Sequence, residues 1–241
     1  MNVKVINCAE EIGRAAAAMF IAQTLKNPKS VLGFATGSTP LPTYKALIGA
    51  CNRSQVDFSK ITTFNLDEYV GLPEMHEQSY RYFMMENLFN FINVNKANIN
   101  TINGDVSDTD AACADFEKRI DDAGGIDLQI LGIGNNGHIA FNEPDDHFPN
   151  ITHKVDLHES TIEANKRFFE SADEVPKSAL TMGIGSIMRA RQIVLIATGE
   201  GKAEAIKAAI RGPITPQCPA SILQLHPCVT FLLDDGAASL L

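Results

Sequence analysis

The chain alternates short apolar runs with longer amphipathic stretches. The apolar runs are continuous and rich in β-branched residues, a pattern typical of strands that are buried on both faces of a parallel sheet. We expect strands at Val3–Ile6, Val31–Ala35, Ile61–Asn65, Asp127–Gly132, Gln192–Ala197 and Val229–Leu233. The stretches between them predict helices at Ala9–Leu25, Leu41–Cys51, Tyr80–Phe91, Asp110–Asp122 and Lys202–Arg211.

Alternating strands and helices predict an α/β fold. Because crossovers between parallel strands are right-handed, we expect an open, mainly parallel, doubly wound (Rossmann-like) sheet with helices on both faces. No linker, charge block or internal repeat divides the chain. We therefore expect one domain over residues 1–241, with an irregular insertion at about 144–179. In such sheets ligands bind beyond the carboxyl ends of the strands, so the functional residues should follow strands.

The composition excludes several functional classes. The 241 residues carry a formal net charge of -9, which repels nucleic-acid backbones, so we expect no nucleic-acid partner. No run approaches the roughly 20 apolar residues of a membrane span. The five cysteines are odd in number and widely spaced, which predicts reduced thiols in the cytoplasm and no metal site.

The segment GFATGSTPLP (Gly33–Pro42) is a candidate anion site. A predicted strand runs into a turn that holds Ser38 and Thr39, and Pro40 is well placed to open the next helix. Exposed amides and hydroxyl groups at a helix start bind phosphate. The alternative is an ordinary turn in which Ser or Thr caps the helix. The segment is not a P-loop, because the Gly-Lys-Ser/Thr ending is missing.

A second candidate is the adjacent carboxylate pair Asp67 and Glu68 in TFNLDEYVGL (Thr63–Leu72). The pair directly follows a predicted buried strand. A carboxylate in a cleft there has its pKa raised toward the range that suits proton abstraction. The alternative is a solvated acidic turn.

The third candidate is LGIGNNGHIAFNEP (Leu131–Pro144), whose glycines satisfy the spacing GxGxxG. A dinucleotide fingerprint must open a helix, whereas this segment runs into proline, so we reject that interpretation. The glycines instead let the backbone approach a small ligand, with Asn136, His138 and Glu143 around it. A lone histidine is usually structural, but one flanked by Asn and Glu after a strand is a catalytic candidate.

Two cations complete the candidate set. Lys202 follows a predicted strand and opens a helix, a position that suits a phosphate group. Arg167 lies in the predicted insertion. The alternative for each is an ordinary surface cation.

Together, TFNLDEYVGL, GNNGHIAFNEP and SILQLHP (Ser221–Pro227) resemble the deaminase branch of the glucosamine-6-phosphate isomerase/6-phosphogluconolactonase superfamily. The resemblance extends from the first strand to about Asp234. It implies conversion of glucosamine 6-phosphate to fructose 6-phosphate and ammonia, without a metal or cofactor. It also implies a short, non-allosteric type.

The resemblance assigns roles to the candidate residues. Asp67 matches the base that moves a proton between C2 and C1, His138 the acid/base that opens the sugar ring, and Glu143 the carboxylate that orients this histidine. Asn136 stands where allosteric relatives carry aspartate; it can orient by hydrogen bonding but adds no charge. The phosphate-binding set is Ser38, Thr39, Arg167 and Lys202.

Two other functions compete with the deaminase. A 6-phosphogluconolactonase-type hydrolase shares the segment Leu131–Pro144 that carries His138 (the histidine segment) but needs no carbon acid base at Asp67. A non-catalytic sugar-phosphate sensor would normally add a helix-turn-helix domain, for which the predicted elements leave no room. We also expect a monomer, with a homo-oligomer as the alternative, because His153 and Val155 stand where allosteric relatives hold an effector phosphate with basic residues.

Overall fold

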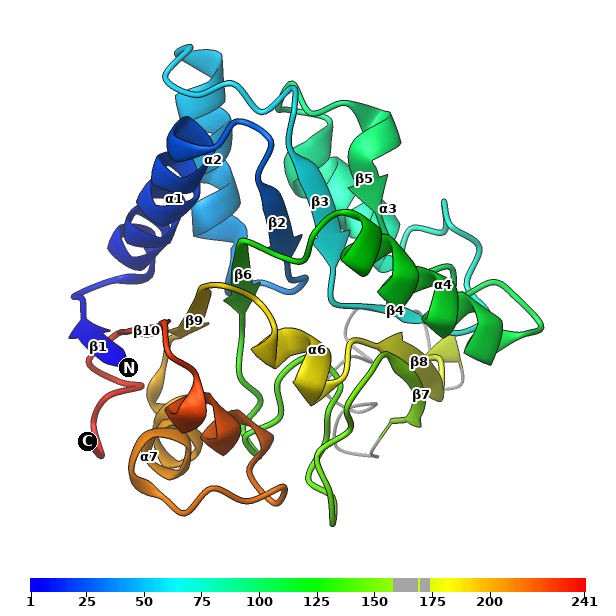
Figure 1. The fold of residues 1–241 in the computed structure, drawn as a ribbon. Coiled ribbons are helices and arrows are strands. Elements are labelled where there is room, and N and C mark those ends of the chain that lie inside the picture. The colour runs from blue at the N-terminus through cyan, green and yellow to red at the C-terminus, as the bar shows by residue number, and fades with distance from the viewer. Residues whose placement is uncertain (158–168, 170–173) are drawn as a thin grey trace.

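The computed structural model describes residues 1–157, 169 and 174–241, and this part of the chain is built around a seven-stranded sheet (Figure 1). Every neighbouring pair in the sheet is parallel, which confirms the predicted α/β fold class. In spatial order the strands are β1 (Asn2–Val5), β10 (Val229–Leu233), β9 (Ile193–Ala197), β6 (Leu128–Leu131), β2 (Val31–Phe34), β3 (Thr62–Asn65) and β5 (Ile99–Asn100).

Helices cover both faces of this sheet. The register of β2 with β3 places Phe34 and Phe64 on opposite faces. Phe34 stacks on Phe20 and meets the edge of Tyr44, whereas Phe64 meets the edge of Phe116. The α-helices are α1 (Ala9–Lys26), α2 (Leu41–Asn52), α3 (Tyr80–Met84), α4 (Thr109–Asp122), α6 (Ile184–Met188) and α7 (Ala203–Arg211). In the described part of the chain, none of them is long and apolar enough to cross a membrane.

Shorter helical turns complete these layers. The predicted helix Tyr80–Phe91 is wrong in part, because α3 ends at Met84 and the chain continues as a π-helical turn, η1 (Met85–Phe89). Within the ranges that the structure describes, the 3₁₀ turns are η2 (Lys96–Asn98), η5 (Glu200–Lys202) and η6 (Pro219–Leu225).

A second, antiparallel sheet lies beside the first. It consists of β4 (Asp67–Tyr69), β8 (Ser178–Thr181) and β7 (His153–Asp156), in that order. The sequence analysis missed it. The predicted irregular insertion is therefore wrong at His153–Asp156, which pairs with β8 along its whole length. These strands have three or four residues, and β4 and β7 carry charged side chains, so they lack the long apolar runs that mark the main sheet.

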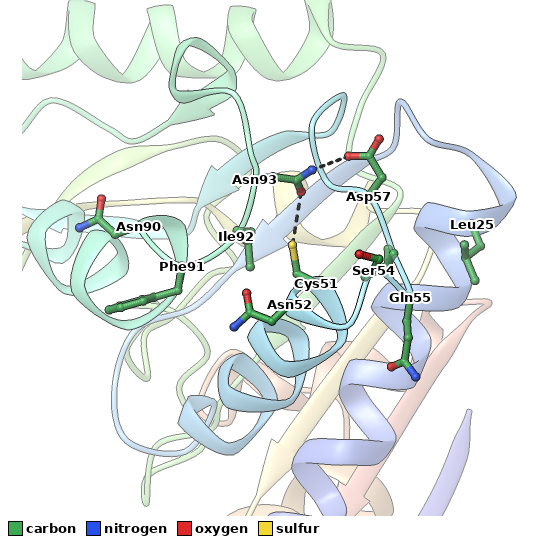
Figure 2. A pocket seen from close by; sticks show the side chains of 11 residues that line it. Leu25, Cys51, Asn52, Ser54, Gln55, Asp57, Asn90, Phe91, Ile92 and Asn93 are labelled. Atoms are coloured by element: carbon green, nitrogen blue, oxygen red, sulfur yellow. Dashed lines mark hydrogen bonds between the residues drawn. The ribbon is translucent and has the colours of Figure 1, made fainter.

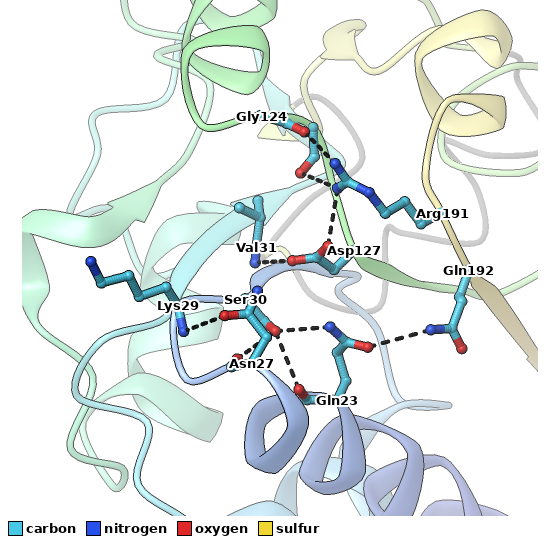
Figure 3. Close-up of polar contacts among 10 residues, drawn as sticks. Gln23, Asn27, Lys29, Ser30, Val31, Gly124, Asp127, Arg191 and Gln192 are labelled. Atoms are coloured by element: carbon cyan, nitrogen blue, oxygen red, sulfur yellow. Dashed lines mark hydrogen bonds and ion pairs between the residues drawn. The ribbon is translucent and has the colours of Figure 1, made fainter.

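A polar network closes the amino edge of the main sheet (Figure 3). The carboxylate of Asp127 accepts a hydrogen bond from the backbone N–H of Val31 at 2.9 Å and pairs with the guanidinium of Arg191 at 3.0 Å. Arg191 also donates to the carbonyl oxygen of Gly124 at 2.9 Å. The loops at this edge are thereby tied together, far from the carboxyl ends of the strands.

Candidate active site

A cavity of about 910 Å³ opens at the carboxyl edge of the main sheet. Much of its lining comes from the segments that follow four strands: Ala35–Pro40 after β2, Leu66–Asp67 after β3, Gly132–Asn136 after β6 and Thr198 after β9. Parallel strands present their carboxyl ends at one edge, so segments distant in sequence meet there. Of the predicted site residues, Ser38, Thr39, Asp67, Asn136, His138 and Lys202 line this cavity.

Another cavity, of about 690 Å³, lies where α1 and α2 end (Figure 2). Its wall includes the exposed side chains of Leu25 and Phe91. The amide of Asn93 donates to Asp57 at 2.7 Å and accepts from the thiol of Cys51 at 3.4 Å. None of the predicted site residues lines it.

The predicted anion site, here called the anion loop (Ala35–Pro40), is held by Tyr44 at the point where it leaves β2. The buried hydroxyl of Tyr44 accepts from the N–H of Ala35 at 3.2 Å and donates to the carbonyl oxygen of the same residue. The loop then turns through Gly37, whose φ of 96° is a conformation that favours glycine. Helix α2 follows after Pro40, so Ser38 and Thr39 lie next to the amino end of a twelve-residue helix. That end attracts an anion.

Lys202 faces the same cavity from the amino end of α7. The preceding turn is fixed by Asp234, whose two carboxylate oxygens accept from the N–H of Gly199 at 2.9 Å each. Burial lowers the pKa of the Lys202 ammonium group, because its charged form has lost water. A bound anion would offset that cost. Arg167, the other predicted cation, lies outside the described residues.

Asp67 begins β4 and is only 7% exposed. Burial, and then the neighbouring charge of Glu68, raise the pKa of Asp67 to about 8. Its backbone pairs with Thr181 of β8. A carboxylate in this setting takes up a proton far more readily than one in water. Asp67 therefore has the properties of a general base at the edge of the cavity.

His138, Glu143 and Asn136 form a hydrogen-bonded group. Nδ1 of His138 lies 3.2 Å from Oε2 of Glu143, and the amide of Asn136 donates to that same oxygen at 2.6 Å. Oδ1 of Asn136 accepts from the backbone N–H of His138 at 3.2 Å. A carboxylate only accepts, so Nδ1 carries the hydrogen and Nε2 is left to exchange a proton with a ligand. Asn136 thus orients Glu143, and Glu143 orients the ring.

The glycine-rich segment leaves space for the ring of His138. A Cβ atom added at Gly134 would lie 2.4–2.5 Å from three atoms of the His138 ring, so the ring packs directly on the glycine backbone. Gly137 has a φ of 87°. Residues 132–144 form no helix, which agrees with rejecting the dinucleotide interpretation. The close neighbour of Gly134 is thus the catalytic candidate itself, not the small ligand that the spacing suggested.

The histidine segment and β4 share one support. The hydroxyl of Thr181 accepts from the N–H of Phe141 at 3.0 Å, and the backbone of Thr181 pairs with Asp67. The amide of Asn142 adds bonds of 2.9 Å each to the carbonyl oxygens of Ile139 and Met182. Strand β8 therefore positions both proton-transfer candidates.

An aromatic wall of the cavity was not predicted from the sequence. The rings of Tyr80 and Phe141 stack with centroids 6.0 Å apart, and Tyr69 lies 4.7 Å from Tyr80. Phe169 meets the edge of Tyr69 at 6.0 Å, and all four rings line the cavity. Tyr69 and Phe141 belong to two of the motifs that carry the resemblance, but nothing in their spacing shows that they meet.

No group of three or more His, Cys, Asp or Glu side chains suited to a metal ion occurs among the described residues. The cavity instead combines an anion loop, a buried carboxylate and a histidine with a free ring nitrogen. With the parallel α/β sheet, these define the class of acid–base enzymes that act on small anionic substrates.

Within that class, the chain belongs to the family of glucosamine-6-phosphate isomerases and 6-phosphogluconolactonases, whose model matches residues 6–231. It is 55% identical to a glucosamine-6-phosphate deaminase of Thermoanaerobacter pseudethanolicus over 232 residues, which are 96% of this chain and 92% of the relative. A glucosamine-6-phosphate deaminase of Clostridium perfringens strain 13 is 52% identical over the full length of both chains.

Solved structures agree with this assignment. A protein described as a monomeric glucosamine-6-phosphate deaminase matches with a TM-score of 0.97 and 43% identity over all of both chains. A 6-phosphogluconolactonase of Thermotoga maritima has a TM-score of 0.77 at 18% identity, covering 97% of this chain and 99% of that one. The second likeness shows a shared fold alone.

Proposed function

We propose that this chain is a glucosamine-6-phosphate deaminase that converts glucosamine 6-phosphate and water to fructose 6-phosphate and ammonia. The observation that carries the proposal is the buried carboxylate of Asp67, with its raised pKa, in the same cavity as His138 and the anion loop. Relatives of that name, 52–55% identical over nearly the whole chain, support it.

The phosphate group of the substrate binds at one end of the cavity. Ser38 and Thr39 offer hydroxyl and backbone donors at the amino end of α2, and Lys202 supplies a positive charge from α7. Arg167 is proposed as a further partner on the resemblance alone. An anchored phosphate fixes the sugar carbons relative to Asp67 and His138, which lowers the entropic part of the barrier.

The first chemical step opens the pyranose ring. Nε2 of His138 takes the proton from the hydroxyl on C1 and returns it to the ring oxygen, which breaks the bond between C1 and that oxygen. Glu143, 3.2 Å from Nδ1, stabilises the imidazolium that forms in between. Asn136 restrains Glu143 through the 2.6 Å hydrogen bond.

The second step isomerises the open chain. Asp67 removes the proton from C2 while the ammonium group on C2 gives a proton to the oxygen on C1, so that a neutral enolamine forms. Asp67 then delivers its proton to C1, which leaves a hydroxyl group on C1 and an iminium group at C2. Water adds to the iminium group, and ammonia leaves together with one proton, so that the C2 ketone of fructose 6-phosphate remains. A base for the C2 proton must be close to C2 and ready to accept a proton near neutral pH, and a pKa of about 8 suits Asp67 to that task.

The rival function is a 6-phosphogluconolactonase-type hydrolase, which needs no carbon acid base. A coupled assay on purified protein without added metal, measuring ammonia and fructose 6-phosphate together, decides between them. We expect equimolar release of both products from glucosamine 6-phosphate. Hydrolysis of 6-phosphogluconolactone without ammonia release from the amino sugar would refute the deaminase.

The organisation of the chain is also proposed. One domain over residues 1–241, with the segment at about 144–179 as a lid, is supported by Phe169, whose ring meets Tyr69 of β4, and by Val155, which packs against the apolar cluster that contains Tyr69. A monomer is supported by the 43% identical structure described as monomeric. The five cysteines are all free in the structure, which supports a cytoplasmic location.

A further inference from the structure

Glu68 is a buried carboxylate that the proposed reaction does not use. Successive residues of a strand point to opposite faces, so Glu68 turns away from the cavity that Asp67 lines. It is 3% exposed, although it is ionisable. The chain passes close behind it at Gly104, where an added Cβ atom would lie 1.9 Å from the carbonyl oxygen of Tyr69. Burying a carboxylate is energetically costly unless hydrogen bonds compensate for the lost water.

The carboxylate of Glu68 joins β4 to the start of α3. Oε1 accepts from the N–H groups of Tyr69 and Tyr80 at 2.9 Å each, and Oε2 accepts from the N–H of Arg81 at 3.0 Å. Helix α3 has only five residues, too few to be stable alone. Its other cap is Ser79, whose hydroxyl accepts from Tyr82 at 3.1 Å.

The segment that Glu68 holds is a wall of the cavity. Gln78, Ser79, Tyr80 and Phe83 line the cavity, and Tyr80 stacks on Phe141 of the histidine segment. Movement of α3 would therefore change the shape of the site beside Asp67. The contacts of Glu68 tie this wall to the strand that carries the base.

Charge is the second property of Glu68. Burial raises the pKa of Glu68, and the three amide donors oppose that rise because they stabilise the ionised form. The titratable groups next to Asp67 are Glu68, the following residue of its strand, Tyr44 of α2 and Tyr80 of α3, and Glu77, His138 and Lys202 lie in the lining of the same cavity. Glu68 is the adjacent buried carboxylate, whereas Glu77 is exposed, and a like charge next to Asp67 favours its protonation.

We propose that Glu68 is a positioning residue for the reaction: it fixes the α3 wall of the cavity to β4 and acts on Asp67 through its charge. This inference rests on the proposed function, but its two parts predict separable effects. The charge of Glu68 affects the proton affinity of Asp67, and the length of the Glu68 side chain affects the position of α3 in the cavity wall.

Two variants separate the parts. Glu68→Gln keeps the size, removes the charge and replaces one acceptor oxygen with an amide donor, so it also loses an N–H contact. Glu68→Asp keeps the charge but shortens the reach to Tyr80 and Arg81, so it tests placement without the loss of charge. Glu77→Gln is the matched control, because Glu77 is an exposed carboxylate that lines the same cavity. Ser79→Ala loosens α3 without touching Glu68.

The readout for charge is the carboxyl ¹³C titration of Asp67 by NMR, assigned with Asp67→Asn. We expect Glu68→Gln to lower the pKa of Asp67 by about one unit. Glu77→Gln and Ser79→Ala should leave it unchanged. The titration needs no turnover, so it remains informative even if the chain fails to deaminate glucosamine 6-phosphate. An unchanged titration in Glu68→Gln would overturn the charge part.

The readout for placement is the Michaelis constant. We expect Glu68→Asp and Ser79→Ala to raise KM for glucosamine 6-phosphate roughly tenfold while the pKa of Asp67 stays raised. Equal KM values in the variants and the wild type would overturn this part. If Glu68→Gln does not fold, the wild-type protein still tests the charge: Asp67 and Glu68 should titrate in coupled steps, and independent single-step curves would refute the coupling.

Discussion

Gly134→Ala should disable the histidine while leaving the fold intact. The added methyl carbon would lie 2.4–2.5 Å from the Cε1, Nδ1 and Nε2 atoms of His138, whereas ordinary contact begins at 3.4 Å. The ring must therefore move by about 1 Å, and it has room to do so because its side chain is 23% exposed. A misplacement of that size costs about 100-fold in rate.

The displaced ring also loses its partner. Nδ1 lies 3.2 Å from Glu143, so a shift away from Gly134 breaks or bends this hydrogen bond and frees the ring to adopt the wrong tautomer. We expect kcat on the cyclic substrate to fall about 100-fold, with little change in KM or melting temperature. An acyclic substrate analogue, which needs no ring opening, should be processed with much less penalty.

Gly132→Ala is the matched control, since an added Cβ at Gly132 meets no atom within 4 Å. Both glycines lie in the same loop, so a general loss of loop flexibility would affect both variants. The reasoning is refuted if Gly134→Ala retains the wild-type kcat, or if Gly132→Ala loses as much. A crystal structure of Gly134→Ala should show the shifted ring directly.

Further predictions concern the base, the histidine and regulation. Asp67→Asn should abolish turnover and the exchange of the C2 proton with solvent while ligand binding survives; exchange at the wild-type rate would mean that another group is the base. Because Asp67 acts when ionised, kcat/KM should rise with pH through about 8. The folded state holds this proton more tightly than the unfolded chain. The free energy of unfolding should therefore fall as the pH rises from the ordinary pKa of an aspartate toward about 8, and urea unfolding of Asp67→Asn should show no such fall. His138→Gln should depress kcat strongly on the cyclic substrate and far less on an acyclic analogue; equal losses would give His138 another role. Substrate saturation should be hyperbolic and unaffected by N-acetylglucosamine 6-phosphate, since Val155 packs against the apolar cluster that contains Tyr69 and offers no charge to an effector phosphate; a sigmoidal curve that this effector makes hyperbolic would contradict that.

The main sheet could be predicted because its strands are continuous apolar runs. Val229–Leu233 was predicted with the bounds that the structure shows, and the other five predicted strands differ by one residue at one or both ends. The edge strand β5 has two residues and was not predicted. Strands β4, β7 and β8 could not be found in this way. Each has three or four residues, and β4 begins with two carboxylates, which resemble a solvated turn.

The candidate residues were found from motifs, but their contacts depend on tertiary structure. The motif predicts Asn136 beside the histidine as an orienting group, and in the structure its amide donates to Glu143, which lies 3.2 Å from the His138 ring, while its oxygen accepts from the backbone N–H of His138. Sequence spacing does not reveal that the His138 ring packs on Gly134. Nor does it reveal that three backbone amides donate to Glu68. Arg167 lies outside the described residues, so its role stays a prediction.

The shared attachment at Thr181 has a consequence for the order of the two chemical steps. Thr181 pairs with Asp67 through its backbone and holds Phe141 through its hydroxyl. Asp67 and the segment that carries His138 are therefore attached to the same residue of β8, so the residue proposed to enolise the sugar and the residue proposed to open its ring are held by one strand. In the proposed reaction, the opened sugar chain meets the second reagent within the same cavity. Strand β8 is thus a shared structural support for the two proposed steps.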